Sequence, residues 1–178
     1  MRSRAAALVG MLALLAGAAA ADPPPFGFGR PATPQEIAAQ DINVLPDGSG
    51  LPPSHGSVEE GAAIYASACA SCHGERGEKP LDGSMRLIGG GGTLATPHPV
   101  MTVGSYWPYA TTLFDYIRRA MPFPAPQSLK PDQVYAVTAY VLHLNGIVPD
   151  GTVLDAATLP AVRMPNRNGF ISDYPPTH

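Results

Sequence analysis

The chain has 178 residues, a length that suits one domain with extensions, and 11 basic against 14 acidic residues give a formal net charge of −3. A mildly acidic chain without a run of basic residues excludes nucleic acid as an expected partner. The 21 prolines, several of them near the two ends, predict irregular arms around a small folded core.

The first residues have the pattern of a secretory signal peptide. A short basic start precedes an apolar run over 5–20, and the alanines at 19–21 match a small-residue cleavage site. The run is too short for a comfortable membrane span, so we expect no stable span. We predict a signal peptide over 1–21 that is cleaved before Asp22, with an uncleaved N-terminal anchor as the alternative.

Residues 22–56 are rich in proline and glycine and form a predicted N-terminal arm. Thr33, Pro34 and Glu36 are typical of a helix start, with Thr33 as the cap and Glu36 completing a capping box. They predict a short helix through about Gln40. The arm is either a linker or a segment that lies across the core. We favour packing on the core because the arm carries several apolar residues: Ile37, Ile42, Val44, Leu45 and Leu51.

A second capping box, formed by Ser57 and Glu60, predicts a helix that runs into Cys69-Ala70-Ser71-Cys72-His73. This Cys-x-x-Cys-His order is the attachment signature for c-type haem. Two thiols separated by two residues can both reach vinyl groups on one edge of a porphyrin. The imidazole of His73 then lies below the ring, where it can bind the iron.

Other uses of the two cysteines explain less. A thioredoxin-like redox pair expects a βαβ context, which the sequence lacks. A zinc site needs four ligands, and there is no second cysteine pair. A disulfide between Cys69 and Cys72 would leave His73 without a role. Haem attachment also agrees with the signal peptide, because c-type haem is attached outside the cytoplasm, and the two features together predict a periplasmic protein.

Residues 74–105 are predicted to be a long loop that wraps over the haem. The glycines at 89–92 do not form a phosphate loop, because no Gly-Lys-Ser/Thr follows them. His98, between Pro97 and Pro99, is an alternative iron ligand, although an ordinary loop histidine is the simpler interpretation.

Trp107 and Pro108 are predicted to open the next helix, which ends at Met121-Pro122 because proline disfavours helix at the residue before it. Further prolines at 124 and 126 stiffen the loop directly after Met121. A thioether suits haem iron opposite histidine and raises its reduction potential. We therefore predict Met121 as the sixth ligand of the iron. The rival methionines lack such a loop: Met85, Met101 and Met164.

Pro131 starts a final predicted helix that ends at Asn145-Gly146, a typical stop. Tyr135 and Leu142 lie off its main apolar face, and that surface needs a cover from an arm of this chain or from a partner protein. Residues 147–178 form a C-terminal extension with little periodicity. The extension is either a disordered tail or a segment that docks onto another subunit.

The order of features over 57–146 resembles the class I cytochromes c: helix, Cys-x-x-Cys-His, glycine-rich loop, tryptophan-bearing helix, Met-Pro loop, final helix. The resemblance implies a small all-α fold whose N- and C-terminal helices cross near the haem edge, with irregular N- and C-terminal arms. It also implies covalent haem c on Cys69 and Cys72, with His73 and Met121 as axial ligands.

A narrower resemblance covers most of the chain after residue 21. Gly29–Thr33, Val103–Pro122 and Leu159–Asn166 are similar to the cytochrome subunits of Sox-type sulfur dehydrogenases (SoxD). Related subunits serve sulfite dehydrogenases. The resemblance implies a SoxC-like partner whose molybdenum cofactor oxidises a sulfur centre. The cytochrome, which is not an enzyme on its own, would pass the electrons to a downstream cytochrome c.

The family likeness also suggests two details of haem binding. Some members carry two haems, whereas the single attachment motif here predicts one. Trp107 and Arg86 are candidate contacts of the haem propionates. Two other functions are compatible with the residues. One is a free-standing electron shuttle, and the other is an enzyme acting at its own haem, which would need the sixth position that Met121 is predicted to close.

Overall fold

The computed structural model describes residues 26, 28–78, 84–171 and 173, so the predicted signal peptide over 1–21 lies outside the described residues. The chain divides into two units, Met1–Ala38 and Ala39–His178. Within the described residues, no helix is both long enough and apolar enough to cross a membrane.

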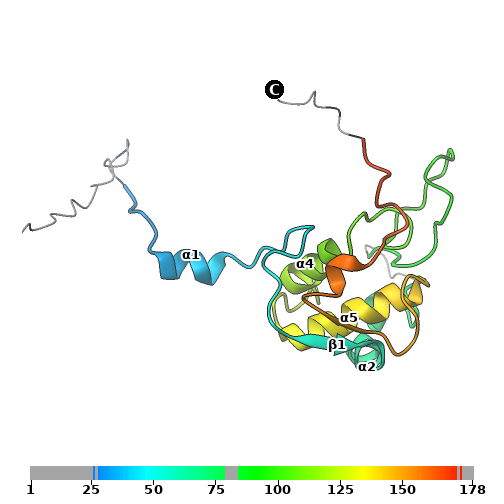
Figure 1. Cartoon of the computed structure of the whole chain (residues 1–178), viewed down its shortest axis with the longest axis horizontal. Helices are drawn as coiled ribbons and strands as arrows, with labels where there is room; N and C mark the ends of the chain where they lie inside the picture. The colour runs from blue at the N-terminus through cyan, green and yellow to red at the C-terminus, as the bar shows by residue number, and fades with distance from the viewer. Residues whose placement is uncertain (1–25, 27, 79–83, 172, 174–178) are drawn as a thin grey trace, which may run out of the picture. The chain divides into compact units, whose positions relative to one another are not determined.

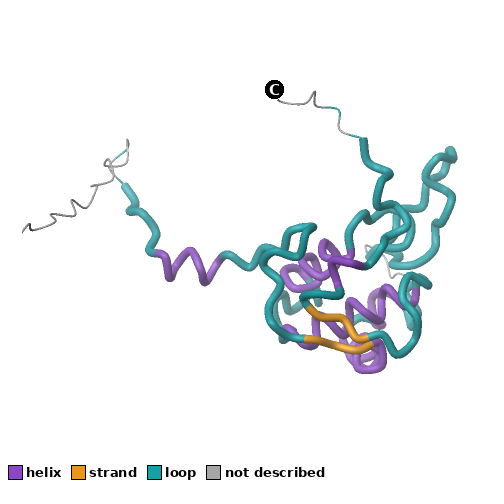
Figure 2. The backbone as a smooth tube through the Cα atoms, viewed as in Figure 1, coloured by secondary structure: helices purple, strands orange, loops and turns teal. Residues whose placement is uncertain are grey.

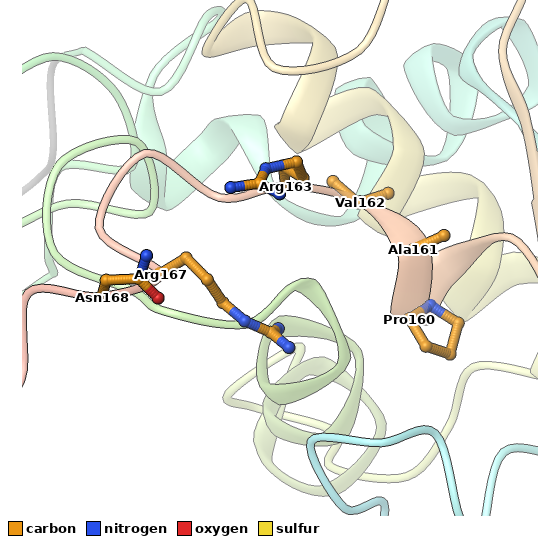
Figure 3. Close-up of a pocket in the computed structure, with 6 residues that line it drawn as sticks. All are labelled: Pro160, Ala161, Val162, Arg163, Arg167 and Asn168. Carbon is orange, nitrogen blue, oxygen red and sulfur yellow. The ribbon is translucent and has the colours of Figure 1, made fainter.

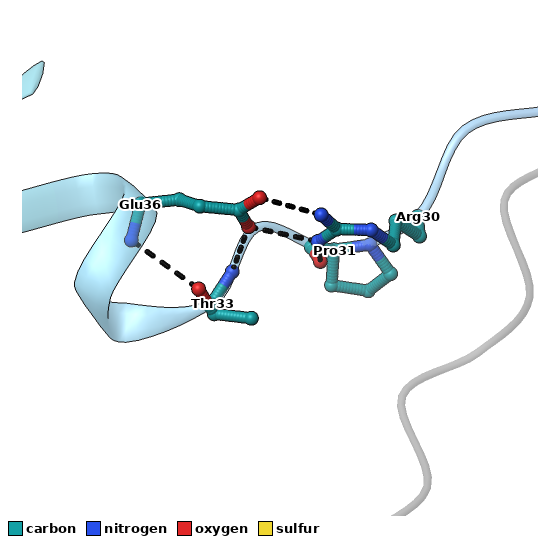
Figure 4. A network of polar contacts seen from close by, with 4 residues as sticks. All are labelled: Arg30, Pro31, Thr33 and Glu36. Carbon is teal, nitrogen blue, oxygen red and sulfur yellow. Dashed lines mark hydrogen bonds and ion pairs between the residues drawn. The ribbon is translucent and has the colours of Figure 1, made fainter.

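The first unit is described around the start of α1 (Pro34–Gln40), where the predicted capping box is confirmed. The Glu36 amide donates to Thr33 Oγ1 at 3.2 Å, and the Thr33 amide donates to Glu36 Oε2 at 2.8 Å. The Arg30 guanidinium also binds the Glu36 carboxylate, with Nη1 2.8 Å from Oε2 (Figure 4). These contacts, the Arg30 bond first, lower the pKa of Glu36 to about 2.

The second unit contains the other elements. They are β1 (His55–Ser57), α2 (Val58–Ala68), α3 (Ala70–His73), α4 (Ala110–Ala120), α5 (Pro131–Leu144), β2 (Val153–Asp155) and a 3-10 helix η1 (Leu159–Ala161). Helix α5 is the centre of this unit, because it packs against both α2 and α4 (Figure 1). The helical fold expected for residues 57–146 is confirmed, and α2 and α5 pack on each other as the resemblance implies.

The contact between α2 and α5 depends on small residues. Helix α2 begins with the predicted capping box between Ser57 and Glu60, and it buries Val58, Gly61 and Tyr65. A Cβ atom added to Gly61 would lie 1.9 Å from the Ala136 carbonyl oxygen, so only glycine allows the two backbones to approach this closely. The rings of Tyr65 and Tyr140 meet beside this point, with their centroids 5.3 Å apart.

The two predicted arms contribute to the same core. Strands β1 and β2 pair antiparallel, with His55 opposite Asp155, and both pack on α5 (Figure 2). Over 147–164 the extension therefore packs on the domain and is not a disordered tail. Its buried residues belong to the main core: Val148, Leu154, Leu159 and Met164.

The part of the N-terminal arm that belongs to the second unit, residues 39–56, lies on α4 and α5, as favoured from its apolar residues. Val44 is buried, and its amide donates to Asp115 Oδ1 at 2.9 Å. The Tyr135 hydroxyl donates to the Pro52 carbonyl oxygen at 3.0 Å. Since Tyr135 is fully buried, the apolar surface that needed a cover is covered by this chain. Ile37 and Leu45, however, are exposed.

One predicted boundary is wrong. Trp107 and Pro108 do not form the first turn of α4, which begins at Ala110 after an extended Tyr109. The preceding residues follow a different hydrogen-bond pattern, in which the Thr102 amide donates to Ser105 Oγ at 2.9 Å and the Tyr106 amide donates to the Thr102 carbonyl. The end of α4 at Ala120, and both ends of α5, agree with the prediction.

Candidate functional site

The Cys-x-x-Cys-His motif lies on a single tight turn at the end of α2. Cys69 ends α2 and precedes α3, and the amides of Cys72 and His73 both donate to the Cys69 carbonyl oxygen, at 3.1 and 3.0 Å. The two thiols are free, with Cys72 exposed and Cys69 half-buried. The turn therefore offers two sulfur atoms and one imidazole from a stretch of five residues that the local hydrogen bonds hold together.

Burial sets the chemistry of the first thiol. It raises the pKa of Cys69 to about 11, with the neighbouring Cys72 as a smaller cause. Cys69 is therefore a protonated thiol at neutral pH. Within the described part of the chain, no group of three or more His, Cys, Asp or Glu side chains is placed to hold a metal ion.

The orientation of His73 is the observation that fits a haem best. Its Nδ1 lies 2.8 Å from the Met85 carbonyl oxygen, an acceptor that requires the ring proton on Nδ1. The other ring nitrogen, Nε2, is then left with a lone pair that can bind iron. Imidazoles that bind metals commonly donate their second N–H to a carbonyl in this way, which fixes the tautomer and the ring plane. The two thiols and the oriented imidazole of His73 therefore fit a covalently attached haem.

The segment that supplies this carbonyl is itself tied to the motif and to α5. Ser84 Oγ donates to the Cys72 carbonyl oxygen at 2.8 Å. Asn145, directly after α5, donates from Nδ2 to the carbonyl oxygens of Leu87 at 3.2 Å and Val141 at 2.9 Å. The sequence analysis missed Asn145 and the Met85 carbonyl, because contacts to backbone carbonyls leave no pattern in the residue types.

Met121 lies where α4 ends. Its backbone is extended, its amide donates to the Ile117 carbonyl at 3.1 Å, and its half-buried side chain packs against the core. The rivals are less suitable. Met164 is 3% exposed within the core, and Met85 is 65% exposed, with its backbone carbonyl in contact with His73 Nδ1. His98 is an exposed loop residue.

The two candidate propionate contacts have other neighbours in this structure. The half-buried Trp107 packs edge-on against Tyr116, with ring centroids 5.7 Å apart. The exposed Arg86 donates from Nε and Nη2 to the Glu78 carbonyl oxygen, both at 3.3 Å. Both assignments stay predictions.

The chain matches a known protein family and a solved structure. The cytochrome c family model matches residues 58–145. The crystal structure of the sulfane dehydrogenase SoxCD from Paracoccus pantotrophus contains a chain that is 50% identical, with a TM-score of 0.77, over 83% of this chain and 72% of that one. A thiosulfate dehydrogenase (TsdBA) from Marichromatium purpuratum is 30% identical over 47% of this chain and 17% of that one, with a TM-score of 0.35. A search of curated proteins finds no match.

Proposed function

Because the chain belongs to the cytochrome c family, we propose that it is the electron-transferring cytochrome subunit of a sulfane dehydrogenase and carries one covalent haem c. The single observation that supports haem binding most directly is the His73–Met85 contact within the Cys-x-x-Cys-His turn. The single haem rests on the two cysteines of the sequence, which suffice for one covalent attachment.

Each residue of the site has a distinct task in this proposal. Cys69 and Cys72 would hold the haem through thioether bonds, and His73 and Met121 would bind its iron. The haem supplies reversible one-electron chemistry. The chain keeps His73 in one orientation through the Met85 carbonyl, and the rigid turn and stiff Met-Pro loop resist movement of the ligands. A site that stays fixed in both redox states exchanges electrons with little structural change. Methionine ligation also raises the potential at which the electron is accepted.

The proposed electron donor is a SoxC-like subunit with a molybdenum cofactor. This assignment comes from the likeness to SoxCD, at 50% identity over 83% of the chain. A two-electron oxidation of a sulfur centre hands over its electrons in two steps, since one haem accepts one at a time. A downstream cytochrome c then receives each electron, so the chain itself catalyses no sulfur chemistry.

The proposed organisation of the whole chain follows from the sequence. A signal peptide over 1–21 would direct the protein to the periplasm, where haem is attached. Residues 22–56, 57–146 and 147–178 would form the N-terminal arm, the cytochrome c domain and the C-terminal extension. The buried Val44 and Leu154 support arms that belong to the folded domain rather than hang free from it.

The test is reduction of the purified haem protein by the catalytic subunit from the same organism. With a sulfane substrate present, we expect the absorption bands of reduced cytochrome c to appear, and we expect gel filtration to show the two proteins in one complex. Sulfite in place of the sulfane substrate distinguishes a sulfite dehydrogenase. A haem protein that runs alone and is not reduced by that subunit would instead be a free-standing shuttle, and the proposal would fail.

A further inference from the structure

A polar pocket opens in the C-terminal extension, away from the cysteine motif in sequence. It has a volume of about 380 Å³ and is formed by the end of η1 and the loop after it. Figure 3 shows the Arg167 side chain reaching from the Asn168 side of the pocket towards the Pro160 side. The pocket is lined by Pro160, Ala161, Val162, Arg163, Arg167 and Asn168.

The loop that carries the two arginines is held in place. Met164, between them, is 3% exposed and forms part of the core, and its carbonyl oxygen accepts from the Arg167 amide at 3.1 Å. Asn166 Nδ2 donates to the Tyr106 carbonyl oxygen at 2.7 Å. The Arg167 guanidinium lies 4.2 Å from the centroid of the Tyr109 ring. Arg167 is thus held in place before a ligand binds, which lowers the entropic cost of ordering its side chain on binding.

The two guanidinium groups have no carboxylate partner within the described residues, where the ion pairs are Arg30–Glu36 and Arg119–Asp115. Arg163 and Arg167 are both exposed, in a chain whose formal net charge is −3. A guanidinium prefers planar, two-oxygen acceptors, and a carboxylate matches this geometry. The complement of the pocket is therefore an anion with carboxylate chemistry.

Aromatic residues next to the pocket favour a protein as the source of that carboxylate. Phe170 is 52% exposed and packs edge-on against Tyr106, which is 38% exposed, with ring centroids 5.1 Å apart. Exposed aromatic rings beside arginine are typical of the residues that contribute most to protein–protein binding. A small hydrated anion would leave these rings uncovered, whereas a protein surface would bury them.

The pocket also lies far from the Met121 end of α4. Tyr109, under Arg167, precedes the first residue of α4, and Met121 follows the last. The helix has 11 residues, which corresponds to a length of about 16 Å. The pocket and Met121 therefore lie at opposite ends of α4.

We infer that this arginine pocket, with the Tyr106–Phe170 pair beside it, docks the catalytic subunit of the proposed dehydrogenase by receiving an acidic side chain between Arg163 and Arg167. The inference rests on the proposed function. It adds the docking surface and the chemistry of the partner residue.

The experiment compares binding of the catalytic subunit to the purified haem protein and to Arg163→Gln, Arg167→Gln and Arg167→Lys variants. Loss of a charged hydrogen bond predicts binding about ten- to hundredfold weaker for each glutamine variant. We expect Arg167→Lys to bind with intermediate affinity, because lysine keeps the charge but loses the planar two-point contact. Arg119→Gln, which removes an equal charge from the ion pair with Asp115, is the control for net charge. The haem spectrum and midpoint potential should stay unchanged in the Arg163 and Arg167 variants.

The outcomes separate the two proposals. If the unaltered protein does not bind the catalytic subunit, the proposed function fails. If it binds, but the pocket variants bind as tightly as Arg119→Gln, the pocket inference alone is wrong. A third measurement tests whether the pocket binds a free inorganic anion instead. The unfolding temperature is compared in sodium sulfate and in sodium chloride of equal ionic strength. The inference would be overturned in favour of an inorganic oxyanion if sulfate raised the unfolding temperature of the unaltered protein but not of the glutamine variants, while these variants still bound the catalytic subunit normally.

Discussion

The imidazole of His73 is oriented by a backbone carbonyl rather than by another side chain. Met85 provides that carbonyl at 2.8 Å from Nδ1, and Ser84 ties the same segment to Cys72. No substitution of a side chain removes a backbone acceptor, so the tautomer of His73 tolerates sequence change at position 85. The sixth ligand differs in this respect, because it depends on one side chain.

Replacing Met121 with alanine tests that dependence. The variant should lose the weak red absorption band of methionine-ligated ferric haem, because the thioether is gone. Its midpoint potential should fall by on the order of 0.1 V, a part of the roughly 0.8 V that axial ligands span. Met101→Ala, at a methionine that is 49% exposed, is the control and should change neither property. An unchanged spectrum and potential in Met121→Ala would show that another group binds the iron.

The buried hydroxyl of Tyr135 predicts a stability change that can be measured at two pH values. Tyr135→Phe removes the bond to the Pro52 carbonyl and should lower the free energy of unfolding at pH 7 by about 1 kcal/mol. Burial also raises the pKa of Tyr135 to about 12. The unfolded chain releases this proton at lower pH than the folded chain, so stability should fall between about pH 10 and pH 12.

The Phe variant should show a shallower decline in that range, because it has no proton to lose there. Denaturant unfolding of the haem protein at pH 7, 10 and 11 gives all the required values. Tyr116→Phe, which alters a tyrosine that is 48% exposed, is the matched control. Equal stabilities of Tyr135→Phe and Tyr116→Phe at every pH would contradict the assigned hydrogen bond.

At the scale of elements, the crossing of α2 and α5 determines how much variation the core accepts. Gly61→Ala places a methyl group 1.9 Å from the Ala136 carbonyl oxygen, so the helices must move apart. Overpacking of this kind should lower the free energy of unfolding by about 1–3 kcal/mol. Gly91→Ala is the control, because an added Cβ there meets nothing within 4 Å. Urea unfolding of both haem proteins checks the difference, and equal midpoints would disprove the close contact.

The elements also show what can be predicted from the sequence. The capping boxes at Thr33 and Ser57 depend on residues three positions apart, and both are present as predicted. The start of α4 was placed too early because a proline near a helix start is not itself a cap, and Tyr109 provides no side-chain cap either. Local signals therefore locate the helices, whereas no side-chain cap marks the first residue of α4.

Contacts between distant residues could not be read from the sequence. Strand β2 has three residues, too few to show an alternating pattern, and its partner β1 precedes it by about a hundred residues. The burial of Met164 could not be predicted for the same reason, because a single apolar residue in an irregular segment forms no periodic pattern. Cys69, Cys72 and His73, by contrast, are neighbours in the chain, so the sequence alone places them together.

For the whole molecule, the extension acts as part of the domain rather than as an addition to it. A chain that ends at Gly146 loses the buried side chains of Val148, Leu154, Leu159 and Met164. Each burial contributes about 1.5–3 kcal/mol, and domains as a whole are stable by only about 5–15 kcal/mol. The shortened chain should therefore yield little folded haem protein, measured as the absorbance of haem per amount of chain produced.

A chain that ends at Asn168 is the control, because it is also shortened but keeps the buried side chains of the extension. The described residues beyond Asn168 are exposed, so their removal should leave the haem yield and the unfolding temperature nearly unchanged. The same chain lacks Phe170, so it should still bind the catalytic subunit less tightly than the full chain, through loss of the ring that packs on Tyr106. Normal haem yield from the chain ending at Gly146 would show that the helices fold without the extension, and that the burial of Leu154 and Leu159 contributes little to stability.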